Sequence, residues 1–188
     1  MKIRELLPPY LYSMQYGDDD KQDEYERLLD VWTDADAVAS FFESHSQEMD
    51  PLFWGDVAEP EVAAARTITE AYDLDEHITT LYHNAKLGVK PDFDDYFQPL
   101  NGEFGYLYIR TPMKAYGPGD PSLLRLYAIK LSSNCYLITG GGIKYCKTMQ
   151  ESPELMAEID KLKSVLSFLK HLGIEDAEDV TNYVRNGC

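Results

Sequence analysis

The sequence predicts an α+β protein in which strands are concentrated after a helical N-terminal half. Apolar residues recur with helical spacing at residues 23–42, 60–86 and 153–172. Strand-like runs instead occupy residues 104–110, 123–131 and 135–147, and turn residues separate them. We therefore expect a small, mainly antiparallel sheet with helices packed on one face and the other face available for binding.

The N-terminal half opens with a short strand-like run and continues as helices. Residues 10–16 are rich in aromatic side chains with a hint of alternation, which is typical of a strand. Two short helices are expected within residues 23–42. A longer helix is expected over residues 60–86, since proline is tolerated in the first turn and Gly88 is placed to cap the C-terminus. Residues 89–102 have the character of a loop.

The C-terminal half combines a meander with two helices. The short polar segment at residues 132–134 predicts a hairpin between the second and third strands. Ser152 and Pro153 then supply an N-cap and a first-turn proline for a helix that ends before Gly173. A last short helix is expected over residues 175–185, with acidic residues in its first turn.

Charge is unevenly distributed over what we expect to be a single domain, residues 1–188. The net charge is −16, and residues 1–100 carry all of it, with seven basic and 23 acidic side chains. Residues 101–188 hold ten of each sign, and residues 101–150 hold six basic and two acidic side chains. A strongly acidic chain is a poor general binder of nucleic acid. The basic island indicates either solvated positions on a sheet or an anion-binding face.

Composition favours a folded cytoplasmic protein. Hydrophobic residues make up 44% and charged residues 27% of the chain, which is enough apolar surface for a core. No run approaches the roughly 18–20 apolar residues that span a bilayer, so no membrane association is expected. The three cysteines are odd in number and form no CxxC pair, which fits a reducing compartment.

The common catalytic signatures are absent from the sequence. It contains no GxSxG, HExxH, P-loop or GxGxxG motif. The glycine run at residues 140–142 is more typical of a bulge or a close backbone approach than of a phosphate loop. All four histidines fall on predicted helices, and His77 and His83 are six residues apart, unlike a helical metal pair. Neither a metal nor a cofactor is expected.

The strands of the meander carry an unusual mixture of side chains. Alternation places aromatic and cationic side chains on one face of residues 104–110. The next strand also has an arginine and a tyrosine on one face, and its Lys130 points to the opposite face unless a bulge intervenes. The planar guanidinium of arginine can donate two hydrogen bonds to phosphate oxygens, and the lysine ammonium adds a point charge. Tyrosine rings can stack on unpaired bases. This mixture suits single-stranded RNA, and it also suits an acidic protein partner. The residues are Tyr106, Tyr108, Arg110, Arg125 and Tyr127, with Lys144 after the glycines.

The same segment resembles a known family. Four segments follow one another along the chain: the run LRLYAIK at residues 124–130, a short turn, the run CYLITGGGIK at residues 135–144, and a helix that begins with Ser-Pro. This order and spacing resemble the RelE/ParE-type toxins of bacterial toxin–antitoxin systems, over roughly residues 104–172. The resemblance implies a small sheet that binds messenger RNA on the ribosome, with a cognate antitoxin as the protein partner.

The resemblance also implies a reaction and the residues that perform it. In such toxins a ribose 2′-OH attacks the adjacent phosphate without a metal, so the chain would be an endoribonuclease that inhibits translation. The implied catalytic residues are Arg125, Lys144 and Tyr145, the last in place of a second lysine. Further RNA contacts would come from Lys114, Lys130 and Lys147. The alternative is a catalytically inactive interaction module on the same fold, which binds an acidic protein partner.

Overall fold

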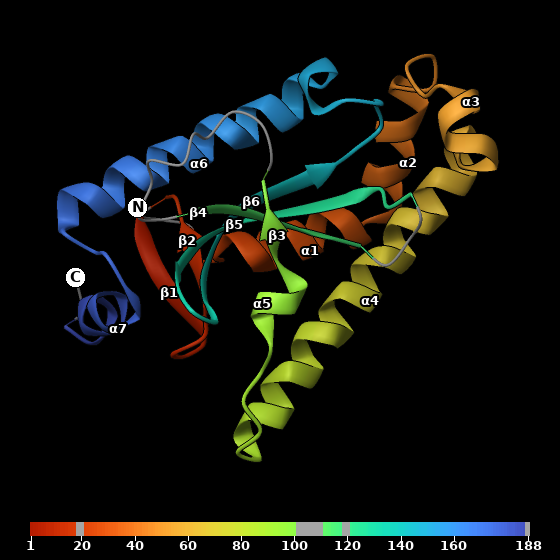
Figure 1. Cartoon of the computed structure of the whole chain (residues 1–188). Coiled ribbons are helices and arrows are strands. Elements are labelled where there is room, and N and C mark those ends of the chain that lie inside the picture. The colour runs from red at the N-terminus through yellow and green to blue at the C-terminus, as the bar shows by residue number, and fades with distance from the viewer. Residues whose placement is uncertain (18–20, 101–110, 118–120, 187–188) are drawn as a thin grey trace.

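The computed structural model describes residues 1–17, 21–100, 111–117 and 121–186, without the side chains of residues 111 and 112. The predicted strand at residues 104–110 lies outside the described residues, and so do Tyr106, Tyr108 and Arg110. The structure confirms the α+β class (Figure 1). Its centre is a mixed sheet whose strands are arranged in the order β1-β2-β6-β5-β4-β3.

The sheet combines an N-terminal hairpin with a three-stranded meander, in which β5 and β6 match the predicted second and third strands and β4 was not predicted. Neighbouring strands are antiparallel except for β2 and β6, which pair in parallel. The predicted strand at residues 10–16 is confirmed as β2, whereas its partner β1 was not predicted. The strands are β1 (Lys2–Leu7), β2 (Leu11–Gln15), β3 (Gln98–Pro99), β4 (Thr111–Tyr116), β5 (Leu124–Ser132) and β6 (Cys135–Ile143).

The sequence predicted three helices in the N-terminal half, and two of them begin with a side-chain cap. Asp23 begins α1 with a capping box that includes Glu26, and the carboxylate of Asp34 caps α2. Pro60 occupies the first turn of the long helix α4, which extends past the sheet at its C-terminal end (Figure 1). These elements are α1 (Glu24–Thr33), α2 (Ala35–Ser44), the single turn α3 (Pro51–Trp54), the 3₁₀ turn η1 (Gly55–Ala58) and α4 (Pro60–Lys86).

The expectation of a loop at residues 89–102 was wrong. This segment contains the short helix α5 (Phe93–Tyr96) and the edge strand β3. The reason is hydrophobic, because Phe93 and Phe97 are buried and the ring of Phe97 stacks on Tyr136 with centroids 4.6 Å apart. Aromatic burial therefore gives a polar, proline-containing segment a fixed position against the sheet.

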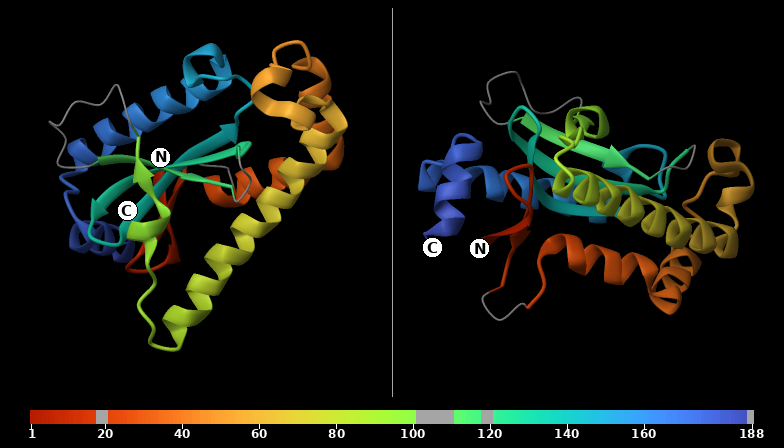
Figure 2. Two further views of the ribbon diagram at one scale, coloured as in Figure 1. Left: turned by 45° about the vertical axis from the view of Figure 1, so that its right-hand side comes forward. Right: turned by 90° about the horizontal axis from the view of Figure 1, so that it is seen from below.

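Both predicted C-terminal helices are present; the first has the predicted ends, and the second begins at residue 177 rather than at residue 175. They are α6 (Pro153–Leu172), preceded by the 3₁₀ turn η2 (Met149–Glu151), and α7 (Ala177–Arg185). Ser152 Oγ accepts a 3.1 Å hydrogen bond from the backbone N–H of Leu155, and Gly173 ends α6 in the left-handed conformation. The helix α7 packs beside β1, so the first strand and the last helix lie at one end of the molecule (Figure 2).

Both faces of the sheet are covered, which corrects the expectation of one open face. Strand residues alternate between two cores. Leu126 and Ile138 face α1, α2 and α4, whereas Ile129 and Leu137 face α6. The helices α1, α2, α4 and α6 are therefore amphipathic, and each buries its apolar side against the sheet.

The glycine run lies inside β6. The register with β5 shifts by one residue between Ile138 and Gly140, which leaves Thr139 as a bulge. Beyond it, Gly141 passes so close to its neighbours that an added Cβ would lie 2.7 Å from the Arg125 carbonyl oxygen and 2.9 Å from the Trp32 ring. The predicted bulge and close approach are confirmed. The strand ends at Ile143 rather than continuing to residue 147.

Candidate functional site

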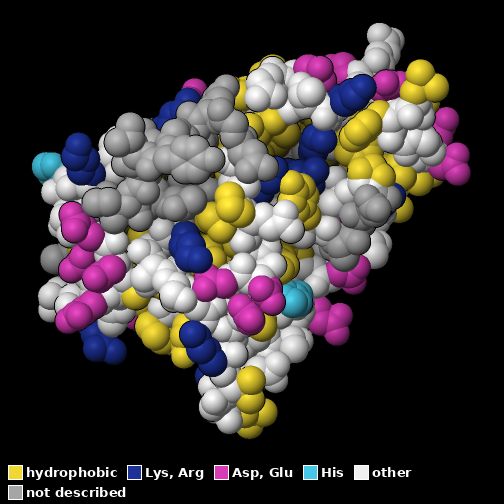
Figure 3. All heavy atoms as spheres, viewed as in Figure 1, with side chains coloured by type: hydrophobic (Ala, Val, Ile, Leu, Met, Phe, Trp, Pro, Cys, Tyr) yellow, Lys and Arg dark blue, Asp and Glu magenta, His cyan; other side chains and the backbone are white. Residues whose placement is uncertain are grey.

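A small cavity opens where β4, β5 and the segment after β6 meet. Its volume is about 220 Å³. Pairing of β4 with β5 places Lys114 opposite Tyr127 and Tyr116 opposite Arg125, so four of its residues are cross-strand neighbours. Figure 3 shows Lys and Arg side chains at the bottom of a hollow on this face, bordered by hydrophobic side chains. We call it the basic pocket; its lining is Leu100, Lys114, Tyr116, Arg125, Tyr127, Lys144, Lys147, Thr148, Met149, Gln150 and Leu155.

Five residues selected from the sequence thus meet in one place. Lys114, Arg125, Tyr127, Lys144 and Lys147 come from three separate segments of the chain and all line the basic pocket. Within the described part of the chain, none of the four cations forms an ion pair, and no Asp or Glu lines the pocket. In a chain of net charge −16, such an uncompensated group of cations is a specific local feature.

Arg125 is the most deeply placed of these cations. Only 8% of its surface is exposed, and Nη1 donates hydrogen bonds to the carbonyl oxygens of Ser122 (2.9 Å) and Leu124 (2.6 Å). Its guanidinium carbon lies 4.3 Å from the centroid of the Tyr116 ring, a cation–π contact. Burial lowers the pKa of Arg125, but arginine remains charged in proteins. The backbone and the ring therefore hold a fixed positive charge at the bottom of the pocket.

Lys144 lies at the side of the pocket. Its backbone N–H donates a 2.7 Å hydrogen bond to the Leu123 carbonyl oxygen, which ties the end of β6 to the start of β5. Burial lowers the pKa of Lys144, and the positive charges of Arg125 and Lys114 lower it further. An anion bound among these groups would oppose that effect, since it favours the charged amine.

The rim of the pocket is built by the turn that precedes α6. Thr148 and Glu151 form a capping box, in which the Thr148 N–H donates to Glu151 Oε2 at 3.1 Å. The hydroxyl of Tyr127 donates to the Met149 sulfur at 3.4 Å, which joins the rim to β5. Backbone turns and packed side chains therefore position the rim in the absence of a ligand.

The structure places Lys130 away from the basic pocket. Its Nζ lies 2.9 Å from Asp94 Oδ1, on the side of β5 that faces α5. Asp94 also accepts hydrogen bonds from the Tyr136 hydroxyl (2.6 Å) and the Asn134 N–H (2.9 Å). Burial acts in the opposite direction, yet these hydrogen bonds outweigh it and lower the pKa of Asp94. Lys130 thus belongs to a structural cluster that fastens α5 to the β5–β6 hairpin.

We expect Asp94→Asn to lower the free energy of unfolding by about 1–2 kcal/mol at neutral pH, because it weakens several hydrogen bonds to a charged acceptor. A group with a lowered pKa in the folded state stabilises the fold above its unfolded pKa of about 3.9, and this contribution is lost as the pH falls below that value. Urea unfolding at pH 7 and again below pH 4 measures the free energy of unfolding of both proteins. The difference between Asp94→Asn and wild type should be smaller at the lower pH. A difference independent of pH would contradict this assignment.

Tyr145 is also outside the basic pocket, although it follows Lys144. Only 1% of its surface is exposed, and its hydroxyl donates a 2.8 Å hydrogen bond to Glu154 Oε2. Its ring packs against His45, with centroids 4.3 Å apart. Burial raises the pKa of Tyr145. The structure therefore gives Tyr145 a packing role and does not bring its hydroxyl to Arg125.

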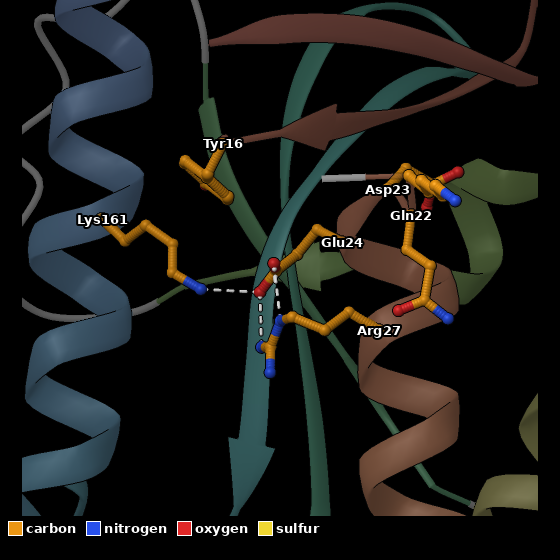
Figure 4. Close-up of a pocket in the computed structure, with 7 residues that line it drawn as sticks. Tyr16, Gln22, Asp23, Glu24, Arg27 and Lys161 are labelled. Atoms are coloured by element: carbon orange, nitrogen blue, oxygen red, sulfur yellow. Dashed lines mark hydrogen bonds and ion pairs between the residues drawn. The ribbon is translucent and has the colours of Figure 1, made fainter. Parts of the chain in front are cut away.

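A second cavity, of about 290 Å³, lies between α1 and α6. Lys161 and Arg27 point at the carboxylate of Glu24, which is only 3% exposed (Figure 4). The Glu24 oxygen lies 2.6 Å from Lys161 Nζ and 2.8 Å from Arg27 Nη2. Lys161 also contacts Glu158, whose pKa is raised by burial. The carboxylates of Glu24 and Glu158 neutralise Arg27 and Lys161, so this network joins α1 to α6.

Sequence reasoning did not select two aromatic residues near the basic pocket. Tyr116 lines it and stacks on Arg125, and Phe53 lies 5.1 Å from Lys144 Nζ. The alternation of Lys114 and Tyr116 along β4 was a usable signal for the first. The position of Phe53 depends on a tertiary contact far apart in sequence, for which the sequence holds no local signal.

Comparison of the chain with family models, with curated protein sequences and with solved structures finds no match. Among the described residues, no cluster of His, Cys, Asp and Glu is suited to hold a metal ion. Within the same residues, no helix has the length and apolar character needed to cross a membrane. The basic pocket, with four cations and no carboxylate among its described lining residues, is the strongest candidate site.

Proposed function

We propose that the basic pocket binds a phosphate group of single-stranded RNA, and that the chain is a RelE-like toxin that cleaves messenger RNA on the ribosome. The observation that carries this proposal is the convergence of four cations without an acidic partner among the described residues. Three of them, Arg125, Lys144 and Lys147, come from the strands and turn on which the resemblance to RelE/ParE-type toxins rests.

The side chains around the cations favour a nucleotide over a simple anion. Tyr116 and Tyr127 line the same cavity, and tyrosine rings stack on unpaired bases. Thr148 and Gln150 add neutral hydrogen-bonding groups at the rim, where sugar hydroxyls can be bound. Since the chain as a whole is acidic, binding depends on this one pocket rather than on a general attraction to the RNA backbone.

Cleavage by this pocket requires charge stabilisation and proton transfer. The ribose 2′ oxygen forms a bond to phosphorus while the bond from phosphorus to the 5′ oxygen breaks, which leaves a 2′,3′-cyclic phosphate. Arg125 and Lys114 would stabilise the charge that develops on the phosphate oxygens. The 2′-OH proton must pass to a base, and the departing 5′ oxygen must gain a proton. Lys144 is suited to the first role because its pKa is lowered.

The experiment is inhibition of a cell-free translation reaction by the purified chain, with mapping of cut messenger ends. We expect Arg125→Gln/Lys144→Gln to require at least about tenfold more protein for the same inhibition, since each lost phosphate contact weakens binding. Lys170→Gln is the matched control, because Lys170 is an exposed lysine on α6 far from the pocket in sequence. It should behave as the wild type.

Two results would contradict the proposal. Equal inhibition by the double variant would show that the basic pocket is not the site. A folded wild-type chain that neither inhibits translation nor cuts messenger RNA would favour a catalytically inactive module. In that case the cations would serve to bind an acidic segment of a protein partner such as an antitoxin, and affinity for that partner would depend on Arg125 and Lys144.

A further inference from the structure

The single-turn helix α3 is held beside the basic pocket by a specific tertiary contact. The carboxylate of Asp50 accepts the Leu52 N–H at 2.9 Å and begins the turn, and Gly55 ends it with a φ of 59°. Trp54 is buried, and its indole Nε1 donates a 2.7 Å hydrogen bond to the Tyr145 carbonyl oxygen. The helix α3 is thus fastened to the residue that follows Lys144.

This anchoring leaves the neighbouring aromatic ring facing solvent. Phe53 is 36% exposed, and its ring meets Trp54 edge to face with centroids 5.0 Å apart. Lys144 Nζ lies 5.1 Å from the centroid of the Phe53 ring. One lysine therefore touches both the basic pocket and an exposed aromatic ring.

We propose that Phe53 forms a base-stacking subsite, which binds the nucleobase of a nucleotide whose phosphate lies in the basic pocket beside Lys144. This inference rests on the proposed function, because it requires RNA in the basic pocket. A phosphate bound at Lys144 lies within the length of one nucleotide from the Phe53 ring, and exposed aromatic rings beside cations are how proteins bind single strands. Because every base has a π-face, the subsite adds affinity with little sequence preference.

The geometry favours a nucleobase over the side chain of a peptide partner. The Phe53 ring is held edge to face by Trp54 and has Lys144 Nζ over it at 5.1 Å, so a flat group that covers its remaining exposed surface meets a ring already fixed in place. The helix that carries it is anchored through the backbone of Tyr145 and is already in place without a ligand. A rigid platform of this kind lowers the entropic cost of binding a planar group.

The test compares a ligand with bases and a ligand without them. We would measure the affinity of the full chain for a short oligoadenylate and for inorganic polyphosphate, using wild type, Phe53→Ala, Phe53→Trp and Tyr72→Ala. Tyr72 is an exposed aromatic residue on α4 and serves as the matched control. We expect Phe53→Ala to weaken oligoadenylate binding about tenfold while polyphosphate binding stays unchanged. Phe53→Trp and Tyr72→Ala should keep the wild-type affinity for both ligands.

The outcomes separate this inference from the proposed function. If the wild type binds the oligoadenylate and Phe53→Ala leaves that affinity unchanged, the stacking subsite is wrong and the RNA site stands. Equal losses for both ligands would also overturn the subsite, since Phe53 would then act only by positioning Lys144. A wild type that binds polyphosphate alone, or neither ligand, would overturn the proposed function and the subsite together.

Discussion

Lys144→Arg is expected to separate RNA binding from RNA cleavage. The variant keeps a positive charge beside Arg125 and Lys114, so affinity for a single strand should change by less than about twofold. Arginine cannot give up its proton near neutral pH, so messenger cleavage should fall by about 10²-fold or more if Lys144 accepts the 2′-OH proton. Binding to an RNA that resists cleavage, together with the rate of cutting on the ribosome, measures the two effects separately.

The pH dependence of cleavage gives the same assignment a second test. A base works when it is unprotonated, so the rate should rise as the pH passes through the pKa of Lys144. With RNA well below saturation the profile reports the free protein, in which burial and the charges of Arg125 and Lys114 lower that pKa, so the rise should occur at a lower pH than for an ordinary lysine, whose pKa is about 10.4. Full cleavage by Lys144→Arg, with an unchanged pH profile, would contradict a proton-transfer role.

Gly141→Ala is expected to destabilise the fold by about 2–3 kcal/mol, which is a large fraction of the stability of a small protein. The added Cβ would lie 2.7 Å from the Arg125 carbonyl oxygen, and the Trp32 ring closes the same space at 2.9 Å. Neither group is the free end of a flexible side chain, so β5, β6 or α1 must move. Urea denaturation measures the loss of stability.

Gly88→Ala is the control for that variant. Gly88 has a φ of 84° and nothing within 4 Å of an added Cβ, so the substitution tests backbone strain alone. We expect it to cost about 1 kcal/mol, clearly less than Gly141→Ala. Equal effects of the two variants would show that enclosure of the glycine run by α1 and β5 is not what requires glycine in β6.

Local signals in the sequence were sufficient for most helices and for two strands of the meander. Asp23, Pro60, Ser152 and Gly173 mark helix ends through their own side chains or backbone preferences, so their effects are readable without tertiary information. The strand β1 was missed because it depends on pairing with β2, and β4 was missed because no local pattern was assigned to residues 111–116. The covering of the second face was also missed. Amphipathic spacing predicts that a helix buries one side, but it does not predict which face of the sheet that side packs against.

The candidate site was predictable in part for a similar reason. Strand alternation selected Arg125, the resemblance to RelE/ParE-type toxins selected both Arg125 and Lys144, and the structure brings them to one pocket. Lys130 is also a cation on β5, but its side chain points to the opposite face of the sheet from that of Arg125. It therefore pairs with Asp94 instead. Tyr145 follows Lys144 in sequence, yet its ring turns into the core. Phe53 became a candidate only through the tertiary contact of Trp54 with Tyr145.

The most direct test of the central claim is to locate bound RNA on the full chain by NMR. A short oligonucleotide with 2′-O-methyl sugars is the ligand, because it lacks the attacking hydroxyl and cannot be cut. We predict that amide signals of residues 114–116, 125–127 and 144–150 shift on titration, with the Lys144 side chain among the largest changes. No shift at near-physiological salt, or shifts concentrated around Glu24 and Lys161 instead, would contradict the account.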